Sequence, residues 1–426
     1  MDDIQKLLEQ LSELDDQIIN CMKCGMCQAV CPVFSQTGNE ADVTRGKLAL
    51  IDALSAQILD NPDHVQETLN RCLMCGTCQA NCPSGVDVVE IFFRARGVMT
   101  GYYGLSSIKK IIFKGMLAKP GFFDGLVSIS AKFQNLFIKG VDEKLGSSCA
   151  RFNLPVVDDR HFNALAKKPL RKIVSGVDTP AGNSGLRIGF YPGCVVDKMY
   201  TNIGLASLKV FEHYGVGVYM PKGQACCGIP VLSSGDKRTF NKLVELNVQK
   251  FGAADFDYLV TPCASCTATI KELWPLMYTG NREISETLKV LGDKCLDINQ
   301  FLVEHLEITV PDETNGNTVT YHDPCHLKNS LKVTRQPRDL LKASGIQFVE
   351  MNDSGTCCGC GGTFNVYHYD MSKEIGNKKA DNIIDSGADL VATSCPACMM
   401  QMTDMLSRRN RGIGVKHVVE LYADSL

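Results

Sequence analysis

Apolar residues recur at two different periods along this chain. In the first hundred residues they return every three to four positions, with acidic or amide side chains between them, and this spacing is typical of amphipathic helices. Four segments of this kind are expected to be helical: residues 3–19, 48–59, 64–70 and 86–98. The N-terminal part of the chain is therefore predicted to be mainly α-helical.

From about residue 185 onward, short apolar runs alternate with amphipathic segments. The apolar runs predict strands over residues 186–191, 216–220, 258–260, 318–322, 347–351 and 390–392. Helices are expected between and after them, over residues 202–214, 240–251, 297–305, 338–343, 371–386 and 417–423. Strands that alternate with helices form parallel sheets, so this part is predicted to hold two α/β domains.

The segment between these parts carries apolar helical pieces interrupted by Pro120, Pro155, Pro169 and Pro180, which predicts short helices followed by a loose linker. Its stretch 109–139 is basic and apolar, and packing against the other domains is favoured for it over a membrane surface or a partner subunit. The fold class is therefore α+β and multidomain. Its expected parts are a helical domain (1–98), a connector (99–184) and two α/β domains (185–308 and 316–426).

The cysteines of the α/β part are duplicated. Cys194 stands alone, Cys226 and Cys227 are adjacent, and Cys263 and Cys266 form a Cys-x2-Cys pair. The same order returns 131 or 132 residues later as Cys325, Cys357, Cys358, Cys395 and Cys398. Parallel sheets bind ligands at the carboxyl ends of their strands, and the cysteines follow the predicted strand ends. Each set of five is therefore expected to converge on one site.

Eight further cysteines form two runs of the type Cys-x2-Cys-x2-Cys-x3-Cys-Pro. This is the spacing of bacterial ferredoxins, in which three cysteines of a run hold one [4Fe-4S] cubane and the fourth reaches the other cubane. One cluster is accordingly assigned to Cys21, Cys24, Cys27 and Cys82, and the other to Cys72, Cys75, Cys78 and Cys31. Nearby Arg45 and Lys47 could screen the charge of the clusters, although a solvated surface is favoured for them.

Zinc and haem are the alternatives for these cysteines. Zinc also binds four thiolates, but two complete runs that each end in proline favour iron–sulfur clusters. No Cys-x2-Cys pair is followed by His, which argues against covalent c-type haem. In the duplicated sets, five thiolates exceed the four that a cubane needs. A cubane with a spare thiol, a zinc site and a cluster that uses all five thiolates remain open there.

Composition limits the partners and the compartment that are expected for the protein. The formal net charge of −3 and the lack of a long basic run argue against nucleic acid as a partner. The first residues show no secretory pattern, so a reducing cytoplasm is expected, in which cysteines bind metal instead of forming disulfides. No apolar run reaches the roughly 18 residues of a transmembrane segment. We expect a cytoplasmic protein, either free or peripheral at the inner face of the cytoplasmic membrane.

The duplicated pattern resembles the CCG, or cysteine-rich, domain, whose better understood members bind a noncubane [4Fe-4S] cluster. The resemblance implies one such cluster on Cys194, Cys226, Cys227, Cys263 and Cys266, and a second on Cys325, Cys357, Cys358, Cys395 and Cys398. Because both sets are complete, two noncubane clusters are favoured over one. Cys360 is expected beside the second site without ligating it, and Cys149 and Cys295 are expected to be structural thiols.

A ferredoxin module followed by two CCG units resembles the family of the D-type subunit of heterodisulfide reductase. That family includes the iron–sulfur subunits of glycolate oxidase and lactate dehydrogenases, and the C-type subunit of anaerobic glycerol-3-phosphate dehydrogenase. Residues 38–47, Gly-Asn-Glu-Ala-Asp-Val-Thr-Arg-Gly-Lys, resemble the glycolate oxidase and lactate dehydrogenase type most.

This resemblance implies an electron-transfer subunit of an oxidoreductase complex. A flavoprotein partner would oxidise a 2-hydroxy acid, and this chain would pass the electrons to a quinone or another membrane acceptor. No Gly-x-Gly-x-x-Gly element lies between a predicted strand and helix, so the FAD is expected on the partner. The alternatives are a catalytic subunit that reduces a disulfide at a noncubane cluster, as in heterodisulfide reductase, and a metal store without redox turnover.

Overall fold

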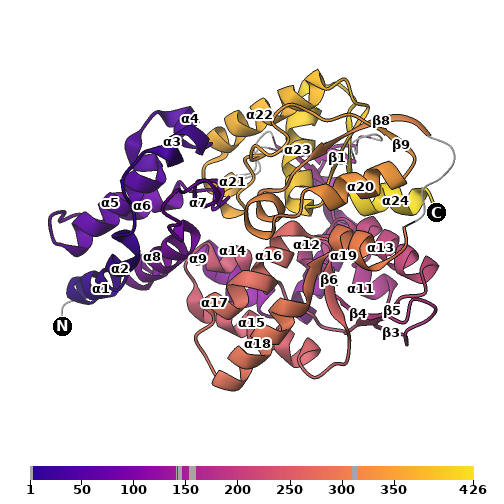
Figure 1. The fold of residues 1–426 in the computed structure, drawn as a ribbon, viewed down its shortest axis with the longest axis horizontal. Coiled ribbons are helices and arrows are strands. Elements are labelled where there is room, and N and C mark those ends of the chain that lie inside the picture. The colour runs from indigo at the N-terminus through magenta and orange to yellow at the C-terminus, as the bar shows by residue number, and fades with distance from the viewer. Residues whose placement is uncertain (1–2, 141, 143–145, 153–159, 309–314) are drawn as a thin grey trace.

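Figure 1 shows the computed structural model, which describes residues 3–140, 142, 146–152, 160–308 and 315–426. Helices form the N-terminal part, at the left of the view, and two α/β repeats lie beside it, one above the other. The first repeat runs from strand β3 to helix α19 and the second from β8 to α24. The predicted fold class, a helical N-terminal module followed by two duplicated α/β units, is confirmed.

The N-terminal part consists of α1 (Asp3–Ser12), α2 (Asp15–Ile18), α3 (Met26–Val30), α4 (Phe34–Thr37), η1 (Glu40–Asp42), α5 (Thr44–Ser55), α6 (Pro62–Asn70), α7 (Thr77–Ala80) and α8 (Val88–Tyr103). The helix expected over residues 3–19 is broken into α1 and α2 by a turn. Leu7, Leu11 and Leu14 are nevertheless all buried, because the turn keeps the apolar stripe on one side.

The connector contains α9 (Ser107–Lys110), a π-helical turn η2 (Ile111–Leu117), α10 (Pro120–Phe137), the antiparallel strands β1 (Ser147–Cys149) and β2 (His161–Asn163), and α11 (Leu170–Ile173). The predicted break at Pro120 is confirmed, because η2 ends at Leu117 and α10 begins at Pro120, but the expectation of short helices was wrong for α10, which has 18 residues. Pro120 is at its first turn, where a missing N–H removes no helical hydrogen bond. The predicted break at Pro155 lies outside the described residues.

The first repeat has a five-stranded sheet of order β3-β5-β4-β6-β7. Its strands are β3 (Val177–Asp178), β4 (Arg187–Phe190), β5 (Gly217–Met220), β6 (Tyr258–Thr261) and β7 (Cys295–Asp297). All neighbouring strands are parallel except β3, which is antiparallel to β5. The helices are α12 (Gly193–Lys198), α13 (Thr201–His213), α14 (Ile229–Leu232), α15 (Lys237–Phe251), α16 (Ala264–Ala268), η3 (Thr269–Leu273), α17 (Trp274–Met277), α18 (Arg282–Lys294) and α19 (Ile298–His305).

The second repeat has the parallel sheet β11-β10-β8-β9. Its strands are β8 (Asn315–His322), β9 (Ile346–Phe348), β10 (Leu390–Thr393) and β11 (Gly414–His417). The helices are η4 (His326–Leu331), α20 (Arg335–Ala343), α21 (Thr363–Tyr367), α22 (Tyr369–Asp385), α23 (Pro396–Arg409) and α24 (Val418–Asp424). Three strands were predicted per repeat. Strands β3, β7 and β11 were missed, because they are short and carry polar residues.

The three parts share their cores. One apolar cluster continues from Leu11, Ile51 and Ile91 of the N-terminal helices to Phe240 of the first repeat and Leu406 of the second. A second cluster lies where α13 packs on α24 and α19 packs on α20, so it joins the two repeats. Each part is thereby held in a defined position against the others.

A buried arginine ties the helical part to the first repeat. Arg96 of α8 donates to the carbonyls of Cys72 (2.8 Å) and Ser233 (2.9 Å), and Thr100 one turn later donates to the carbonyl of Ser234. Gly235 follows with a φ of +78°, and a Cβ there would lie 2.3 Å from the carbonyl oxygen of Arg96. Only glycine allows this close approach.

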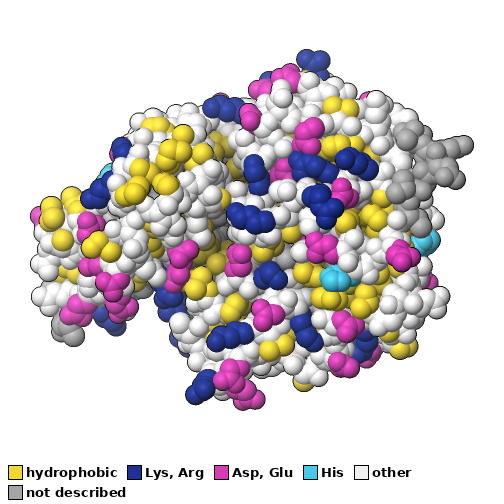
Figure 2. Space-filling view, viewed as in Figure 1, with side chains coloured by type: hydrophobic (Ala, Val, Ile, Leu, Met, Phe, Trp, Pro, Cys, Tyr) yellow, Lys and Arg dark blue, Asp and Glu magenta, His cyan; other side chains and the backbone are white. Residues whose placement is uncertain are grey.

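Two surface properties bear on the expected partners. Lys and Arg side chains are interspersed with Asp and Glu on the face in Figure 2, so this face has no continuous basic surface. Among the described residues, no helix has both the length and the apolar character that crossing a bilayer requires.

Candidate metal centres

The ferredoxin-type cysteines line two neighbouring small cavities in the helical part. One cavity is lined by Cys21, Cys24, Cys27 and Cys82, and also by Cys78, which lies between the two cavities and lines both. The other is lined by Cys31, Cys72, Cys75 and Cys78. The structure therefore groups these side chains in the two crossed sets that the spacing predicts, and their role as ligands remains a prediction.

The two runs have the same local backbone. Lys23 and Met74 each precede the second cysteine of their run and have φ values of +56° and +55°, and Gly25 and Gly76 follow that cysteine at +85° and +70°. Two residues with left-handed backbone, one on each side of this cysteine, curve the loop around a common centre. Non-glycine residues adopt this region rarely, so both loops hold strain that a bound group can compensate.

Lys47 is a buried cation beside the second of these cavities. Its side chain is 1% exposed, donates from Nζ to the carbonyl of Asp42 (2.8 Å) and lines the cavity that contains Cys31 and Cys72. The expectation of a solvated surface was therefore wrong for this residue. A buried ammonium favours thiolates nearby, whereas burial, together with the neighbouring Cys72 and Cys75 thiols, raises the pKa of Cys31 to about 11. This donor set fits an anionic thiolate-bound cluster.

The cysteines of both repeats line a single cavity of about 430 Å³. In the first repeat, Cys194 follows β4, the pair Cys226 and Cys227 follows β5, and Cys263 follows β6. The cavity is lined by Cys194, Cys226, Cys227, Cys263, Cys266, Cys325, Cys357, Cys358, Cys360, Cys395 and Cys398. The convergence of each set was predicted, but the sharing of one cavity was not.

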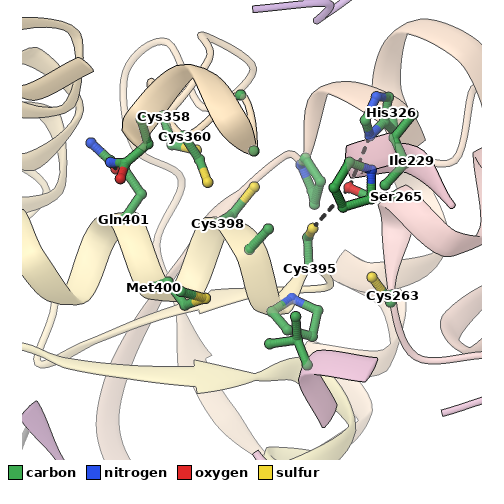
Figure 3. A pocket seen from close by; sticks show the side chains of 18 of the residues that line it. Ile229, Cys263, Ser265, His326, Cys358, Cys360, Cys395, Cys398, Met400 and Gln401 are labelled. Carbon is green, nitrogen blue, oxygen red and sulfur yellow. Dashed lines mark hydrogen bonds between the residues drawn. The ribbon is translucent and has the colours of Figure 1, made fainter. Parts of the chain in front are cut away.

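The two Cys-x2-Cys loops touch across this cavity. The backbone N–H of Ala264 donates to the carbonyl of Ser394 at 3.1 Å. Ser265 Oγ lies 3.6 Å from Cys395 Sγ and 3.0 Å from His326 Nδ1, as the dashed lines in Figure 3 show. A residue of the first repeat thus contacts a cysteine of the second.

The thiols of each set interact closely. Cys194 Sγ lies 3.6 Å from Cys226 Sγ. Hydrogen bonds from the thiols of Cys226 and Cys266 hold the pKa of Cys227 well below its ordinary value. In the second repeat, Cys357 and Cys398 lower the pKa of Cys358 in the same way. A lowered pKa favours the thiolate form of Cys227 and Cys358, which is the form that binds metal.

One residue that the sequence reasoning missed is His322, at the end of β8. Its ligand nitrogen and the sulfurs of Cys358 and Cys398 all lie within 4.8 Å of one another. Burial lowers the pKa of His322 to about 3, so the ring is neutral. The sequence did contain a signal for this residue. His322 lies three residues before Cys325, and the corresponding position of the first repeat, three residues before Cys194, is occupied by Tyr191.

The three remaining cysteines differ in their surroundings. Cys360 lines the shared cavity, and its expected role beside the second site stays a prediction. Cys295 is fully buried in β7, and Cys149 is half-buried in β1. Neither lines the three cavities that contain the other cysteines.

Comparisons with known proteins agree with this organisation. Residues 17–86 match the 4Fe-4S dicluster domain, and residues 188–271 and 319–403 match the cysteine-rich domain. The probable glycolate oxidase iron–sulfur subunit of Bacillus subtilis is 29% identical, over 91% of this chain and 89% of that protein. Lactate utilization protein A of a Geobacillus species is 32% identical, over 55% of this chain and 98% of that protein. The B-type subunit of the fumarate reductase (CoM/CoB) of Methanothermobacter marburgensis is 29% identical, over 84% of this chain and 73% of that protein.

Proposed function

Because this chain belongs to the family of iron–sulfur proteins that join a 4Fe-4S dicluster domain to two cysteine-rich domains, we propose that it is the iron–sulfur subunit of a flavin-dependent lactate or glycolate dehydrogenase complex. Two of its relatives are named as a probable glycolate oxidase iron–sulfur subunit and as a lactate utilization protein. The FAD belongs to a partner flavoprotein, and the acceptor is a quinone or another carrier.

The proposed ligands form four sets. The first two hold cubanes: Cys21, Cys24, Cys27 and Cys82, and Cys72, Cys75, Cys78 and Cys31. The other two hold noncubane [4Fe-4S] clusters: Cys194, Cys226, Cys227, Cys263 and Cys266, and Cys325, Cys357, Cys358, Cys395 and Cys398. When bound, clusters of this kind supply one-electron transfer.

The observation that carries the proposal is the contact between the helical part and the second repeat. Cys75 and Cys357 belong to one small buried cluster with Leu73 and Phe364, and the neighbouring Cys357 thiol, together with burial, raises the pKa of Cys75. Since the second repeat also contacts the first across the shared cavity, the four sets form a continuous series. Such a series suits a subunit that connects a donor to an acceptor.

The test is purification of the tagged chain from its native host without oxygen. We expect a flavoprotein to copurify, and the complex to reduce an artificial dye with lactate or glycolate while the isolated chain does not. In a Cys75→Ser complex, the substrate should still bleach the flavin, but dye reduction through this chain should fall at least tenfold. Substrate oxidation by the chain alone would overturn the proposal.

A second candidate function is disulfide reduction at the shared cavity. Two observations favour it: cysteines of both repeats surround one space of about 430 Å³, and one relative belongs by name to a CoM/CoB fumarate reductase. Turnover of a disulfide substrate with a reduced dye, without any flavoprotein, would favour this candidate over the first. The same assay on the Cys358→Ala variant should then show no turnover.

We also propose that the connector contacts a membrane surface. The sequence pattern favoured packing for this segment, but α10 leaves Ile129, Phe133, Leu136 and Phe137 between 52% and 63% exposed. Lys132 of the same helix is exposed, as are Lys119 and Lys139, which flank the helix. Apolar side chains beside lysines suit the interface of an anionic bilayer.

A further inference from the structure

The two repeats differ at one buried position beside their cysteines. Tyr191 and His322 each precede the first cysteine of their set by three residues. The Tyr191 hydroxyl donates to the carbonyl of Ala225 at 2.6 Å, so its polar atom has a protein partner. His322 is 1% exposed, and among the described residues its Nε2 has no hydrogen-bond partner. A buried polar atom without a partner is costly, which points to a bound group.

The other ring nitrogen fixes which atom carries the proton. His322 Nδ1 lies 3.2 Å from the carbonyl oxygen of Ser354. A carbonyl oxygen only accepts hydrogen bonds, so Nδ1 must carry the proton and donate it. The neutral ring then has a lone pair on Nε2. Histidines that bind metals show this arrangement, in which the second nitrogen donates to a backbone carbonyl.

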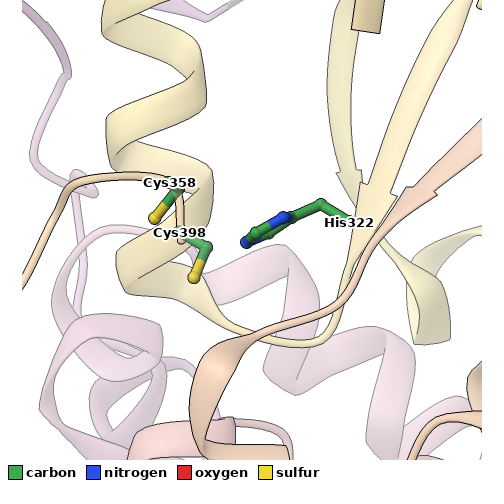
Figure 4. A group of neighbouring side chains, drawn as sticks. All are labelled: His322, Cys358 and Cys398. Atoms are coloured by element: carbon green, nitrogen blue, oxygen red, sulfur yellow. The ribbon is translucent and has the colours of Figure 1, made fainter. Parts of the chain in front are cut away.

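The lone pair is directed at two cysteines of the second set. Figure 4 shows the ring of His322 pointing from the end of β8 toward Cys358 and Cys398. The ligand nitrogen and the two sulfurs lie within 4.8 Å of one another, although they come from three different segments. Ligands that share one tetrahedral metal, with bonds of about 2.0–2.3 Å, lie a little closer together than this. A metal ion between them therefore requires only small movements of side chains.

We propose that His322 Nε2 ligates an iron of the centre in the second repeat, on the same iron as Cys358 and Cys398. This inference rests on the proposed function in one respect, namely that an iron–sulfur centre occupies the second repeat. The first repeat offers no equivalent nitrogen, because Tyr191 stands there. The two centres are therefore chemically unequal. Imidazole ligands raise the reduction potential of iron–sulfur centres relative to thiolates, so the second centre has the higher potential.

The direct test is hyperfine spectroscopy of the holoprotein after labelling with 15N-histidine. The cubane sets contain only cysteine, so a nitrogen coupling strong enough for a direct Fe–N bond must come from the repeats. We expect this coupling in the wild-type protein and its loss in His322→Gln, with a lowered reduction potential of one centre. His326→Gln is the matched control, since the half-buried His326 directly follows Cys325 and its Nδ1 contacts Ser265 Oγ instead. The coupling should persist in that variant.

Three outcomes would overturn the inference. Iron–sulfur signals from the second repeat without any histidine coupling would remove the ligand and leave the proposed function intact. A coupling that survives in His322→Gln would assign the nitrogen to another residue. Iron analysis that finds no centre in the second repeat would overturn both the ligand and the cluster assignment. The wild-type measurement decides the question even if the variant fails to fold.

Discussion

Asn329 of the second repeat donates a 2.9 Å hydrogen bond from Nδ2 to the carbonyl oxygen of Cys75 in the second ferredoxin run. The same amide donates to Thr77 Oγ1 at 3.0 Å. The loop that presents Cys75 is therefore held by the repeat that contains Cys357. Asn329 and Cys75 are far apart in the sequence. Their contact joins the helical part, with its two proposed cubane sites, to the repeats, with the other two proposed sites.

Replacing Asn329 with Ala should loosen this junction. The Cys75 carbonyl would lose its side-chain donor, and an unsatisfied group of this kind costs about 1–3 kcal/mol. We expect a lower melting temperature and weaker magnetic coupling between the second cubane and the second repeat. Asn81→Ala is the control, because exposed Asn81 bonds to the Thr77 carbonyl within its own part. Equal effects of the two variants would contradict the role of Asn329.

The cubane assignment predicts the iron content of cysteine variants. Cys75→Ser should lower the iron of anaerobically purified protein by about one four-iron cluster, because each cubane needs four ligands. Cys149→Ser should leave the iron content unchanged, since Cys149 lies in β1, away from both ferredoxin-type cavities. Full iron in a Cys24→Ser, Cys75→Ser double variant would refute the assignment.

The duplicated sets predict that neither cysteine of a pair is spare. Changing Cys226, Cys227, Cys357 and Cys358 to Ala one at a time should remove iron in all four variants. Iron analysis and paramagnetic resonance of oxidised and thiol-treated samples measure this. Loss in the second repeat alone would make the first set structural or zinc-bound. A further cubane signal in any variant, beyond those of the two ferredoxin-type clusters, would show that the fifth thiolate of that set is no ligand.

A buried carboxyl group predicts a pH dependence of stability. Burial raises the pKa of Asp297 to about 7, while its Oδ1 accepts a 2.9 Å hydrogen bond from the backbone of Asn299. The folded state keeps this proton at pH values where the unfolded state has lost it. The contribution to stability is thus present near pH 4 and is lost as the pH rises through 7, at about 1.4 kcal/mol for each unit of pKa difference.

An Asp297→Asn variant retains the acceptor at the helix end and cannot ionise. Its melting temperature relative to wild type should therefore be higher at pH 8 than at pH 5.5. The exposed Asp293 provides the control, and Asp293→Asn should follow wild type at both pH values. If the difference between Asp297→Asn and wild type does not change with pH, Asp297 ionises normally in the folded protein.

The exposed face of α10 predicts membrane binding. Phe133→Ser combined with Leu136→Ser should abolish sedimentation with anionic lipid vesicles, because the apolar contact area is lost. Ile58→Ser removes an apolar side chain that is even more exposed, from another part of the surface, and should leave sedimentation unchanged. Binding that is absent in the wild-type protein would exclude this surface as a membrane contact.

Features that depend on local spacing could be predicted from the order of residues alone. The ferredoxin runs are short loops in which Cys21, Cys24 and Cys27 lie within one turn region, so their grouping follows from the chain itself. The strands before Cys194 and Cys263 were also found, because buried parallel strands are continuous apolar runs. The duplication then extended each of these conclusions to the second repeat.

Features that depend on contacts between distant segments emerged only from the folded arrangement. Strands β7 and β11 form only because they pair with β6 and β10, since their own residues lack an apolar pattern. Burial of Lys47 results from the packing of α5, and the shared cavity results from the docking of one repeat on the other. His322 became a candidate ligand only when the fold directed its unpaired nitrogen toward Cys358 and Cys398. Local periodicity carries no information about such contacts between distant segments, because they depend on how whole helices and strands pack.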